Sequence, residues 1–153
     1  MKDFYQHGLQ FGCTQCHACC RGEPGYVMLS HRDIEQLATH LCLPTRQFLL
    51  QYCRPVERYQ GVFISLIEKP NYDCIFWDEG CTVYQARPFQ CSSYPFWGFI
   101  VNSEESWKHE QSSCPGIGRG KLHSAEHIRA LLDQRSREQY AQWSEYFSAE
   151  ETG

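Results

Sequence analysis

Apolar residues recur at helical spacing just after position 30, at Ile34, Leu37, Ala38 and Leu41. Residues three and four apart lie on one face of a helix, so this spacing predicts an amphipathic helix. Ser30 lies directly before the run, and Asp33 comes three residues after Ser30, in an arrangement that resembles a capping box. We therefore expect a helix over about residues 31–41.

A second helix is expected soon after the first. Pro44 permits a new helix start, because its missing N–H falls where a helix needs no internal donor. Phe48 and Tyr52 then repeat on one face as far as Cys53. Cys42 and Cys53 lie on or beside these two helices. We interpret both as buried structural thiols, since cysteine is among the most often buried residue types.

Residues of high strand propensity follow these helices. Residues 61–67 read Gly-Val-Phe-Ile-Ser-Leu-Ile, a composition typical of a strand. Residues 73–77 and 81–84 predict two further strands, which a short turn joins into a small hairpin. This hairpin would carry Cys74 and Cys81 at its ends or near its tip.

The end of the sequence predicts another helix. Ser124 can cap it, Glu126 lies in its first turn, and apolar positions continue to about Ser148. Apolar residues are missing between Leu132 and Trp143, so we expect the distal half to be exposed or to contact a protein partner. The aromatic patch of this distal half consists of Trp143, Tyr146 and Phe147.

Together these elements predict a small, irregular, single α+β domain. It would have two or three helices and a small antiparallel hairpin or sheet, built around a cysteine metal site. At 153 residues the chain is long enough for one globular domain. We expect residues 1–122 to form the cysteine-cluster, metal-binding domain and residues 123–153 to form a C-terminal helix packed on it.

Charge and hydropathy argue against some classes of function. The formal net charge is −4 and the 14 Lys and Arg residues are scattered, whereas a general nucleic-acid binder needs a basic stripe that releases counterions from phosphates. No run approaches the roughly 18 apolar residues of a membrane-spanning helix. The first residues lack the apolar core of a signal peptide. We therefore expect a cytoplasmic protein with reduced thiols, and neither nucleic acid nor membrane as a partner.

Ten cysteines are the main chemical feature of the chain. Thiolates are strong ligands for zinc and iron, and two-residue spacers let neighbouring sulfurs converge on one metal. In a reducing compartment, metal ligation is favoured over a disulfide framework. The candidate metal ligands are the crowded group Cys13, Cys16, Cys19 and Cys20, and the later residues Cys74, Cys81, Cys91 and Cys114.

The spacing of these cysteines leaves the type of metal centre open. Cys13, Cys16 and Cys19 match the first three ligands of a bacterial iron–sulfur run, and Cys114-Pro115 could supply the Cys-Pro pair that closes such a run. The same spacing also occurs in zinc clusters. Eight cysteines could form two zinc sites, an iron–sulfur cluster with a zinc site, or one bridged polynuclear site. His17 is more simply a loop residue or an outer hydrogen-bond donor than a ligand.

Three other segments carry weaker chemical signals. Residues 87–97 are rich in proline and aromatic residues, and we expect an irregular loop that packs over the metal site, with an anion-binding groove around Arg87 as the alternative. Residues 116–121 are glycine-rich but lack the spacing of a phosphate-binding loop. A tight connection into the last helix explains them better. His123 and His127 are not expected to form a metal site, because Ser124 indicates that His123 precedes the helix.

The order of these motifs resembles the CxxCxxCC, or YkgJ-type, cysteine-cluster family, over roughly residues 11–120. The residues that carry the resemblance are 11–22 around the first cluster, the helix expected after it, Cys74 with Phe76, residues 80–84, Arg87-Pro88, Cys91, Tyr94-Pro95-Phe96 and residues 114–118. Ser92 departs from the pattern, since an Arg is expected after the third downstream cysteine. The resemblance implies that the cysteines chelate zinc or iron.

Three functions stay open at this point. The first is a metal-binding protein whose zinc, iron or iron–sulfur centre has a structural or redox-sensing role. The second is a metalloenzyme or an accessory component of a protein-modification system, because related cysteine clusters resemble part of flagellin lysine-methylating proteins. The third is an interaction module that uses metal only for folding and binds a protein partner through its C-terminal helix. Whether the protein is an enzyme is therefore left open.

Overall fold

The computed structural model describes residues 3–13, 26–78 and 81–147. The chain forms two compact units, each built from two separate stretches of sequence. Unit 1 comprises Met1–Cys19 and Ser93–Glu138, and unit 2 comprises Cys20–Ser92 and Gln139–Gly153. Helices and short antiparallel strands occur in both units, so the predicted α+β class is confirmed.

Unit 2 opens with the helix that the apolar spacing predicts. Helix α1 spans His31–His40, and its buried face is formed by Ile34, Leu37 and Ala38. Its N-terminus carries a complete capping box, because the Ser30 side chain accepts from the Asp33 N–H while the Asp33 side chain accepts from the Ser30 N–H. Such a cap contributes about 1 kcal/mol to helix stability.

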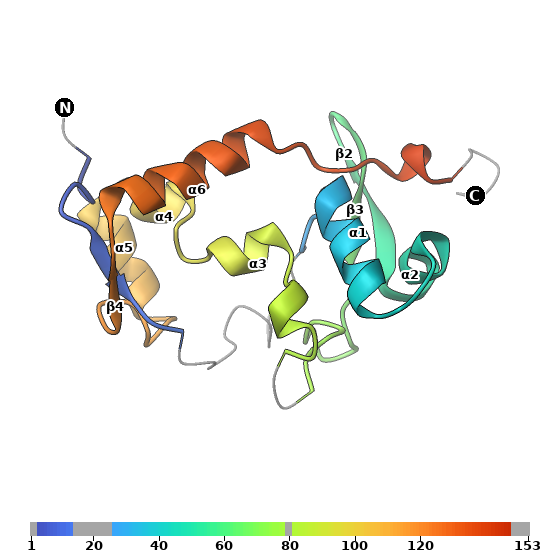
Figure 1. Ribbon diagram of the computed structural model, residues 1–153, viewed down its shortest axis with the longest axis horizontal. Helices are drawn as coiled ribbons and strands as arrows, with labels where there is room; N and C mark the ends of the chain where they lie inside the picture. Colours follow the sequence, from blue (N-terminus) through green and yellow to red (C-terminus); the bar gives the residue numbers. More distant parts are fainter. Residues whose placement is uncertain (1–2, 14–25, 79–80, 148–153) are drawn as a thin grey trace. The chain divides into compact units, whose positions relative to one another are not determined.

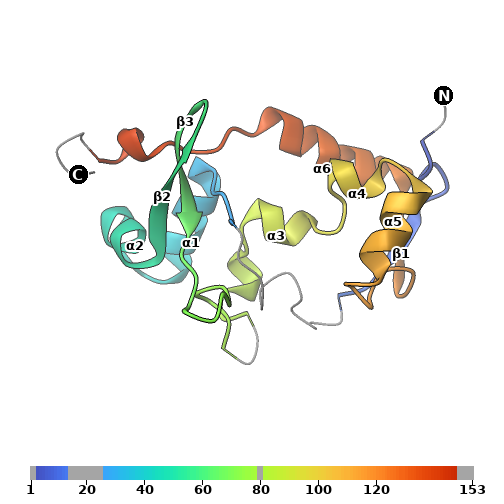
Figure 2. The same cartoon turned by 180° about the vertical axis from the view of Figure 1, so that it is seen from behind.

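A second helix and a hairpin follow in unit 2 (Figures 1 and 2). Helix α2 spans Thr45–Tyr52, strand β2 spans Cys53–Arg58 and strand β3 spans Gly61–Leu66. The strands pair antiparallel from Cys53↔Leu66 to Arg58↔Gly61. The strand over residues 61–67 and the helix before Cys53 are thus confirmed. The partner of β3 is β2, which the sequence analysis did not predict.

The other edge of β3 is covered by two segments from opposite ends of the sequence. The Leu29 N–H donates to the Ile64 carbonyl at 3.0 Å, and the Leu66 N–H donates to the Val27 carbonyl at 3.1 Å. Beyond this pair, Phe63 bridges to Gln142. The C-terminal segment therefore extends the β-structure of unit 2.

This arrangement corrects the expected C-terminal helix. Helix α6 spans Ala125–Arg137 and ends there, and only a short 3₁₀ turn, η2 (Trp143–Glu145), follows it before residue 148. Trp143 and Phe147 are buried in the core of unit 2, where their rings stack with centroids 4.5 Å apart. The patch that suggested a partner surface is largely part of this core.

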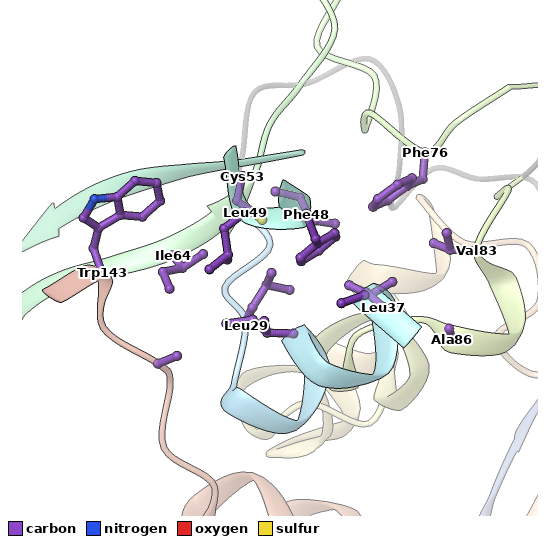
Figure 3. Close-up of a cluster of buried hydrophobic side chains, with 14 of the residues drawn as sticks. Leu29, Leu37, Phe48, Leu49, Cys53, Ile64, Phe76, Val83, Ala86 and Trp143 are labelled. Carbon is purple, nitrogen blue, oxygen red and sulfur yellow. The ribbon is translucent and has the colours of Figure 1, made fainter. Parts of the chain in front are cut away.

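The core of unit 2 lies between α1, α2 and the hairpin (Figure 3). Its fully buried members come from each of these elements and from the segment before α1. They include Leu29, Ile34, Leu37, Phe48, Leu49 and Ile64. Trp143 and Phe147, which come from the C-terminal segment, also pack into this core. At about 25 cal/mol per Å² of apolar surface, each such side chain contributes on the order of 2 kcal/mol by burial.

Unit 1 has a core of its own. Strand β1 (Leu9–Phe11) pairs antiparallel with β4 (Lys121–His123), and helices α4 (Gly98–Val101), α5 (Glu104–Gln111) and α6 complete the unit. Ser103 caps α5 and Ser124 caps α6. The buried apolar residues that these elements share include Leu9, Phe96, Ile100, Trp107, Ile117 and Ile128.

Two further short elements lie at the end of the first long stretch of unit 2. They are the 3₁₀ turn η1 (Tyr84–Ala86) and helix α3 (Phe89–Ser93). The irregular loop expected over residues 87–97 instead contains helix α3, and α4 begins directly after it, because several backbone N–H groups donate to carbonyls three and four residues earlier. Within the part of the chain that the structure describes, no helix is both long and apolar enough to span a membrane.

Candidate metal centre

The eight predicted ligands divide into described and undescribed residues. Cys16, Cys19 and Cys20, together with His17, lie outside the residues that the structure describes. The other five are Cys13 and Cys114 in unit 1, and Cys74, Cys81 and Cys91 in unit 2.

Backbone pairing holds the chain next to Cys13 against the loop that contains Cys114. The Gly12 N–H donates to the Gly116 carbonyl at 3.1 Å, and the Gly118 N–H donates to the Gln10 carbonyl at 2.9 Å. Residues 116–118 thus flank the edge of β1 that β4 leaves open. Because Cys13 follows Gly12 and Cys114 precedes Gly116 by two residues, this pairing holds together the chain segments that contain the two cysteines.

Glycines make this close passage of two backbones sterically feasible. A Cβ atom on Gly116 would lie 2.0 Å from the Gly12 carbonyl oxygen, and one on Gly120 would lie 2.8 Å from the Gly12 Cα. Gly120 also has a φ of +81°, in the region that favours glycine. The glycine-rich run therefore serves backbone packing, and it leads through β4 into α6 as a tight connection.

Cys114 and Cys13 differ in exposure. Cys114 is only 6% exposed and follows α5, where its N–H donates to the Glu110 carbonyl at 3.0 Å. Cys13 is exposed. One candidate thiol of unit 1 is therefore buried in its core, and the other is exposed two residues after β1.

A polar pair accompanies Cys114 in unit 1. The Tyr94 hydroxyl donates to the Glu110 carboxylate with an O···O distance of 2.5 Å. Burial raises the pKa of Tyr94 strongly, and both the Glu110 carboxylate and the Cys114 side chain add to the rise. Tyr94 therefore stays protonated, and its single hydroxyl hydrogen is donated to the Glu110 carboxylate.

Packing explains most of the segment from Arg87 to Trp97. Phe96 is buried in the core of unit 1 and stacks on Trp107 with centroids 5.9 Å apart. The Arg87 guanidinium lies over the Tyr84 ring at 3.8 Å, and its Nε donates to the Tyr84 carbonyl. The Arg87 side chain is thus engaged by the nearby Tyr84.

Cys74 and Cys81 lie in a series of tight turns in unit 2, which corrects the predicted hairpin. Cys74 makes an isolated bridge to Glu68, and Cys81 makes one to Trp77. The Trp77 N–H donates back to the Cys74 carbonyl at 2.8 Å. These turns therefore provide hydrogen bonds for backbone groups that would otherwise pair in a longer two-stranded ladder. Both cysteines are half-buried and pack against the core of unit 2.

Side chains reinforce these turns. The Lys69 ammonium donates to the Trp77 carbonyl, and Thr82 donates to the Phe76 carbonyl through both its N–H and its hydroxyl. Asp73 is buried and accepts from the Asn71 side chain. Cys74 and Cys81 are consequently held on a loop whose shape is set by several independent hydrogen bonds.

Cys91 is the third candidate ligand in unit 2. It lies in α3 and its N–H donates to the Pro88 carbonyl at 2.9 Å. The preceding residues, Phe89 and Gln90, are hydrogen-bonded to the side chain of Asp33 and to the backbone of residues 26–28. The sequence pattern indicates Asp33 only as a helix cap and contains no signal for Gln90.

The two remaining cysteines have opposite environments. Cys53 is buried, as predicted, and burial raises the pKa of its thiol from 9.0 to about 12. Cys42 is exposed, so its predicted burial is wrong. It follows α1 with a φ of +57°, and this left-handed turn places it between two helices rather than on a packed helix face.

The histidines near α6 form a ring contact rather than a ligand pair. The rings of His123 and His127 stack with centroids 5.5 Å apart. His123 Nε2 hydrogen-bonds to the Phe11 carbonyl at 3.0 Å. Among residues 3–13, 26–78 and 81–147, no three His, Cys, Asp or Glu side chains form a group that could hold a metal ion. The described residues alone thus do not form a complete ligand set.

No solved structure matches the chain. The CxxCxxCC family model, described as "Putative zinc- or iron-chelating domain", matches residues 12–115. The match begins one residue before Cys13 and ends one residue after Cys114, so all eight candidate ligands lie inside it. On this match over more than half of its length, the chain belongs to the CxxCxxCC family of zinc- or iron-chelating domains.

Proposed function

We propose that the protein binds zinc or iron, the latter as single ions or as an iron–sulfur cluster, through its eight clustered cysteines. The proposed ligands are Cys13, Cys16, Cys19, Cys20, Cys74, Cys81, Cys91 and Cys114. The role of the metal is structural or redox-sensing, in a reducing compartment such as the cytoplasm. The family description supports metal chelation in general, and the ligand set and the role are our proposal.

The Gly12–Gly116 pairing is the observation that supports this proposal most directly. It holds the chain beside Cys13 against the loop of Cys114, although about 100 residues separate the two cysteines. Glycine is needed at position 116 because any Cβ there would overlap the Gly12 carbonyl. This pairing of the segments that contain Cys13 and Cys114 supports the proposal that a distant cysteine completes the thiolate shell begun by the Cys-x-x-Cys run.

The donor set fits both metals. Zinc takes four thiolates in tetrahedral geometry, and four thiolates also hold the common iron–sulfur clusters. Bound zinc would be redox-inert and would link chain segments, whereas an iron–sulfur cluster would also permit electron transfer or sensing. The proposed ligands come from three stretches of sequence, around residues 13–20, 74–91 and 114.

Metal analysis of anaerobically purified protein tests the proposal. We expect zinc or iron in stoichiometric amount, with a visible thiolate-to-iron absorption band if a cluster is present. Removal of the metal by a chelator should lower the melting temperature, because metal-binding free energy is then lost from the folded state. Protein that carries neither metal when purified, takes up neither afterwards and melts unchanged with chelator would contradict the proposal.

Cysteine variants test the ligand assignment. Cys16→Ser and Cys81→Ser should each lower both metal content and melting temperature. Cys42→Ser is the matched control, since Cys42 is exposed and outside the proposed ligand set. Its metal content should equal that of the wild type. Unchanged metal content and melting temperature in both ligand variants would refute the assignment.

A further inference from the structure

Gln90 ties helix α3 to the chain that follows the cysteine cluster. Its Oε1 accepts from the Met28 N–H at 3.2 Å, and its Nε2 donates to the Tyr26 carbonyl at 2.9 Å. The side-chain amide thus binds both a donor and an acceptor of one extended segment, as a neighbouring strand would. Gln90 directly precedes Cys91, and Tyr26 lies six residues after Cys20.

Asp33 ties the beginning of α3 to helix α1. Its side chain is buried, with only 4% of the residue exposed. Oδ1 accepts from the Phe89 N–H at 2.9 Å, and Oδ2 accepts from the Ser30 N–H at 3.0 Å. One carboxylate therefore serves two N–H groups, one at the cap of α1 and one at the first residue of α3.

The two ties act on consecutive residues. The Asp33 carboxylate accepts from the Phe89 N–H, and the Gln90 side chain binds the backbone of residues 26–28. Cys91 is the next residue of the same short helix. Helix α3 has only five residues, so its internal hydrogen bonds give it little stability of its own. The position of Cys91 in unit 2 therefore depends on these side-chain contacts to α1 and to the segment before it.

We propose that Gln90 and Asp33 are positioning residues of the metal site, which hold Cys91 in register with the chain that leaves the cysteine cluster. This inference rests on the proposed function, because it assumes that Cys91 is a ligand. Groups that orient metal ligands without touching the metal commonly change metal affinity by about 10-fold to 100-fold when they are replaced. The expected effect of losing Gln90 or Asp33 is of that size.

The side chains allow graded variants. Gln90→Ala removes both contacts, whereas Gln90→Glu keeps an acceptor for the Met28 N–H and loses the donor to the Tyr26 carbonyl. Asp33→Asn keeps the shape but offers one carbonyl oxygen for two N–H groups. Ile64→Val is the matched control, because it removes one methylene from the fully buried core of the same unit, on strand β3, and should cost about 1 kcal/mol of stability.

Two measurements separate positioning from general destabilisation. The first is competition for bound zinc or iron with a chromogenic chelator, in which Gln90→Ala and Asp33→Asn should lose metal affinity about 10-fold to 100-fold. Gln90→Glu should fall between Gln90→Ala and the wild type, and Ile64→Val should match the wild type. The second is alkylation of Cys91 in metal-free protein, followed by mass spectrometry, which should be several-fold faster in Gln90→Ala than in Ile64→Val.

The outcomes distinguish the two proposals. Wild-type protein that binds neither zinc nor iron overturns the proposed function, and the metal role of Gln90 and Asp33 with it. Wild-type protein that binds metal, with Gln90→Ala and Asp33→Asn variants whose metal affinity and Cys91 alkylation match those of Ile64→Val, overturns only the positioning role. Circular dichroism at the temperature of each assay confirms that every variant compared is folded.

Discussion

Gly116 and Gly98 differ in what a methyl group would meet. At Gly116 the added Cβ would overlap the Gly12 carbonyl oxygen at 2.0 Å, whereas at Gly98 it would meet nothing within 4 Å. Gly116→Ala should therefore separate the loop of Cys114 from the chain beside Cys13. We expect it to lower the free energy of unfolding by at least about 3 kcal/mol, and to lower metal content as well.

Gly98→Ala is the control for that substitution. Gly98 is the first residue of α4, where alanine costs less backbone entropy than glycine. The free energy of unfolding of the Gly98→Ala variant should equal that of the wild type or exceed it by up to about 1 kcal/mol, as measured by denaturant titration. Equal stability of the two alanine variants would show that the Gly12–Gly116 contact is not required.

Cys53 and Cys42 should differ sharply in reactivity. Alkylation proceeds through the thiolate, and burial raises the pKa of Cys53 from 9.0 to about 12. At pH 8 the Cys53 thiol is therefore protonated and shielded, while Cys42 is exposed. In native protein treated with iodoacetamide, Cys42 should be modified and Cys53 should not, as read by peptide mass spectrometry. Modification of Cys53 at the rate of Cys42 would contradict its burial.

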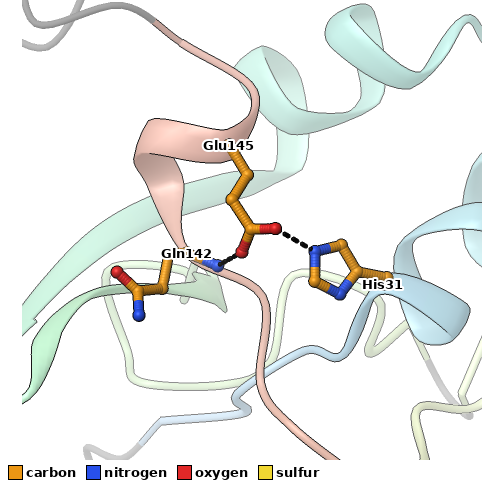
Figure 4. Close-up of polar contacts among 3 residues, drawn as sticks. All are labelled: His31, Gln142 and Glu145. Carbon is orange, nitrogen blue, oxygen red and sulfur yellow. Dashed lines mark hydrogen bonds and ion pairs between the residues drawn. The ribbon is translucent and has the colours of Figure 1, made fainter.

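At the scale of elements, the turn η2 is closed by one carboxylate (Figure 4). Glu145 Oε1 accepts from the Gln142 N–H at 2.8 Å, and Oε2 lies 2.7 Å from His31 Nε2 at the beginning of α1. The backbone hydrogen bond from Gln142 is the largest cause that holds the pKa of Glu145 below 4.5, and His31 adds to it. A carboxyl group whose pKa is lower in the folded state stabilises the fold above pH 4.5, and this contribution disappears as the pH falls through the lowered pKa.

Glu145→Gln tests this contact. The side chain is about half exposed, so solvent screens the interaction and the loss at pH 7 should stay below about 1 kcal/mol. The difference in melting temperature between wild type and variant should shrink when the pH is lowered from 7 to 3. A difference that is constant over this range would show that the ionised carboxylate adds nothing.

Sequence patterns predict some elements better than others. The predictable ones are stabilised by local hydrogen bonds, whereas the others depend on tertiary contacts. Helix α1 could be predicted because its apolar period and its Ser30–Asp33 cap agree. Strand β2 was missed because it carries Arg54, Pro55 and two further charged residues, so nothing in its composition indicates a strand. Its strand conformation comes from pairing with β3, which is a tertiary contact.

The C-terminal segment shows the opposite error. Trp143 and Phe147 are four residues apart, a spacing that also fits a helix face. In the structure both rings pack into the core of unit 2, Trp143 from the 3₁₀ turn η2 and Phe147 from just after it. Gln142, directly before the turn, bridges to Phe63 at the edge of β3. An unpaired strand edge elsewhere in the fold cannot be recognised in the local sequence.

The residues of the candidate site likewise differ in whether the sequence predicts them. The spacing of the cysteines indicated the eight candidate ligands, because thiol pairs at short spacers have few other uses in a reduced protein. Gln90 could not be predicted, since its partners are backbone groups more than 60 residues away. Asp33 was recognised as a cap, but a carboxylate has two oxygens, and the partner of the second one depends on tertiary structure.

For the molecule as a whole, two separate cores predict separable effects of core mutations. Trp143 belongs to the core of unit 2 and Ile128 to that of unit 1. Trp143→Ala and Ile128→Ala should each cost about 2–5 kcal/mol. Hydrogen exchange should then increase mainly in the unit that carries the substitution, because local opening follows cooperative units. Equal loss of protection in both units for either variant would mean that they open as one.

Because each unit combines an early and a late stretch of sequence, the order of translation has a consequence for the thiols. All ten cysteines are synthesised by residue 114. At that point Ile128, which belongs to the core of unit 1, has not been synthesised, and neither have Trp143 and Phe147 of the core of unit 2. On the ribosome, the nascent chain therefore presents its cysteines to metal ions and oxidants before either core can shelter them.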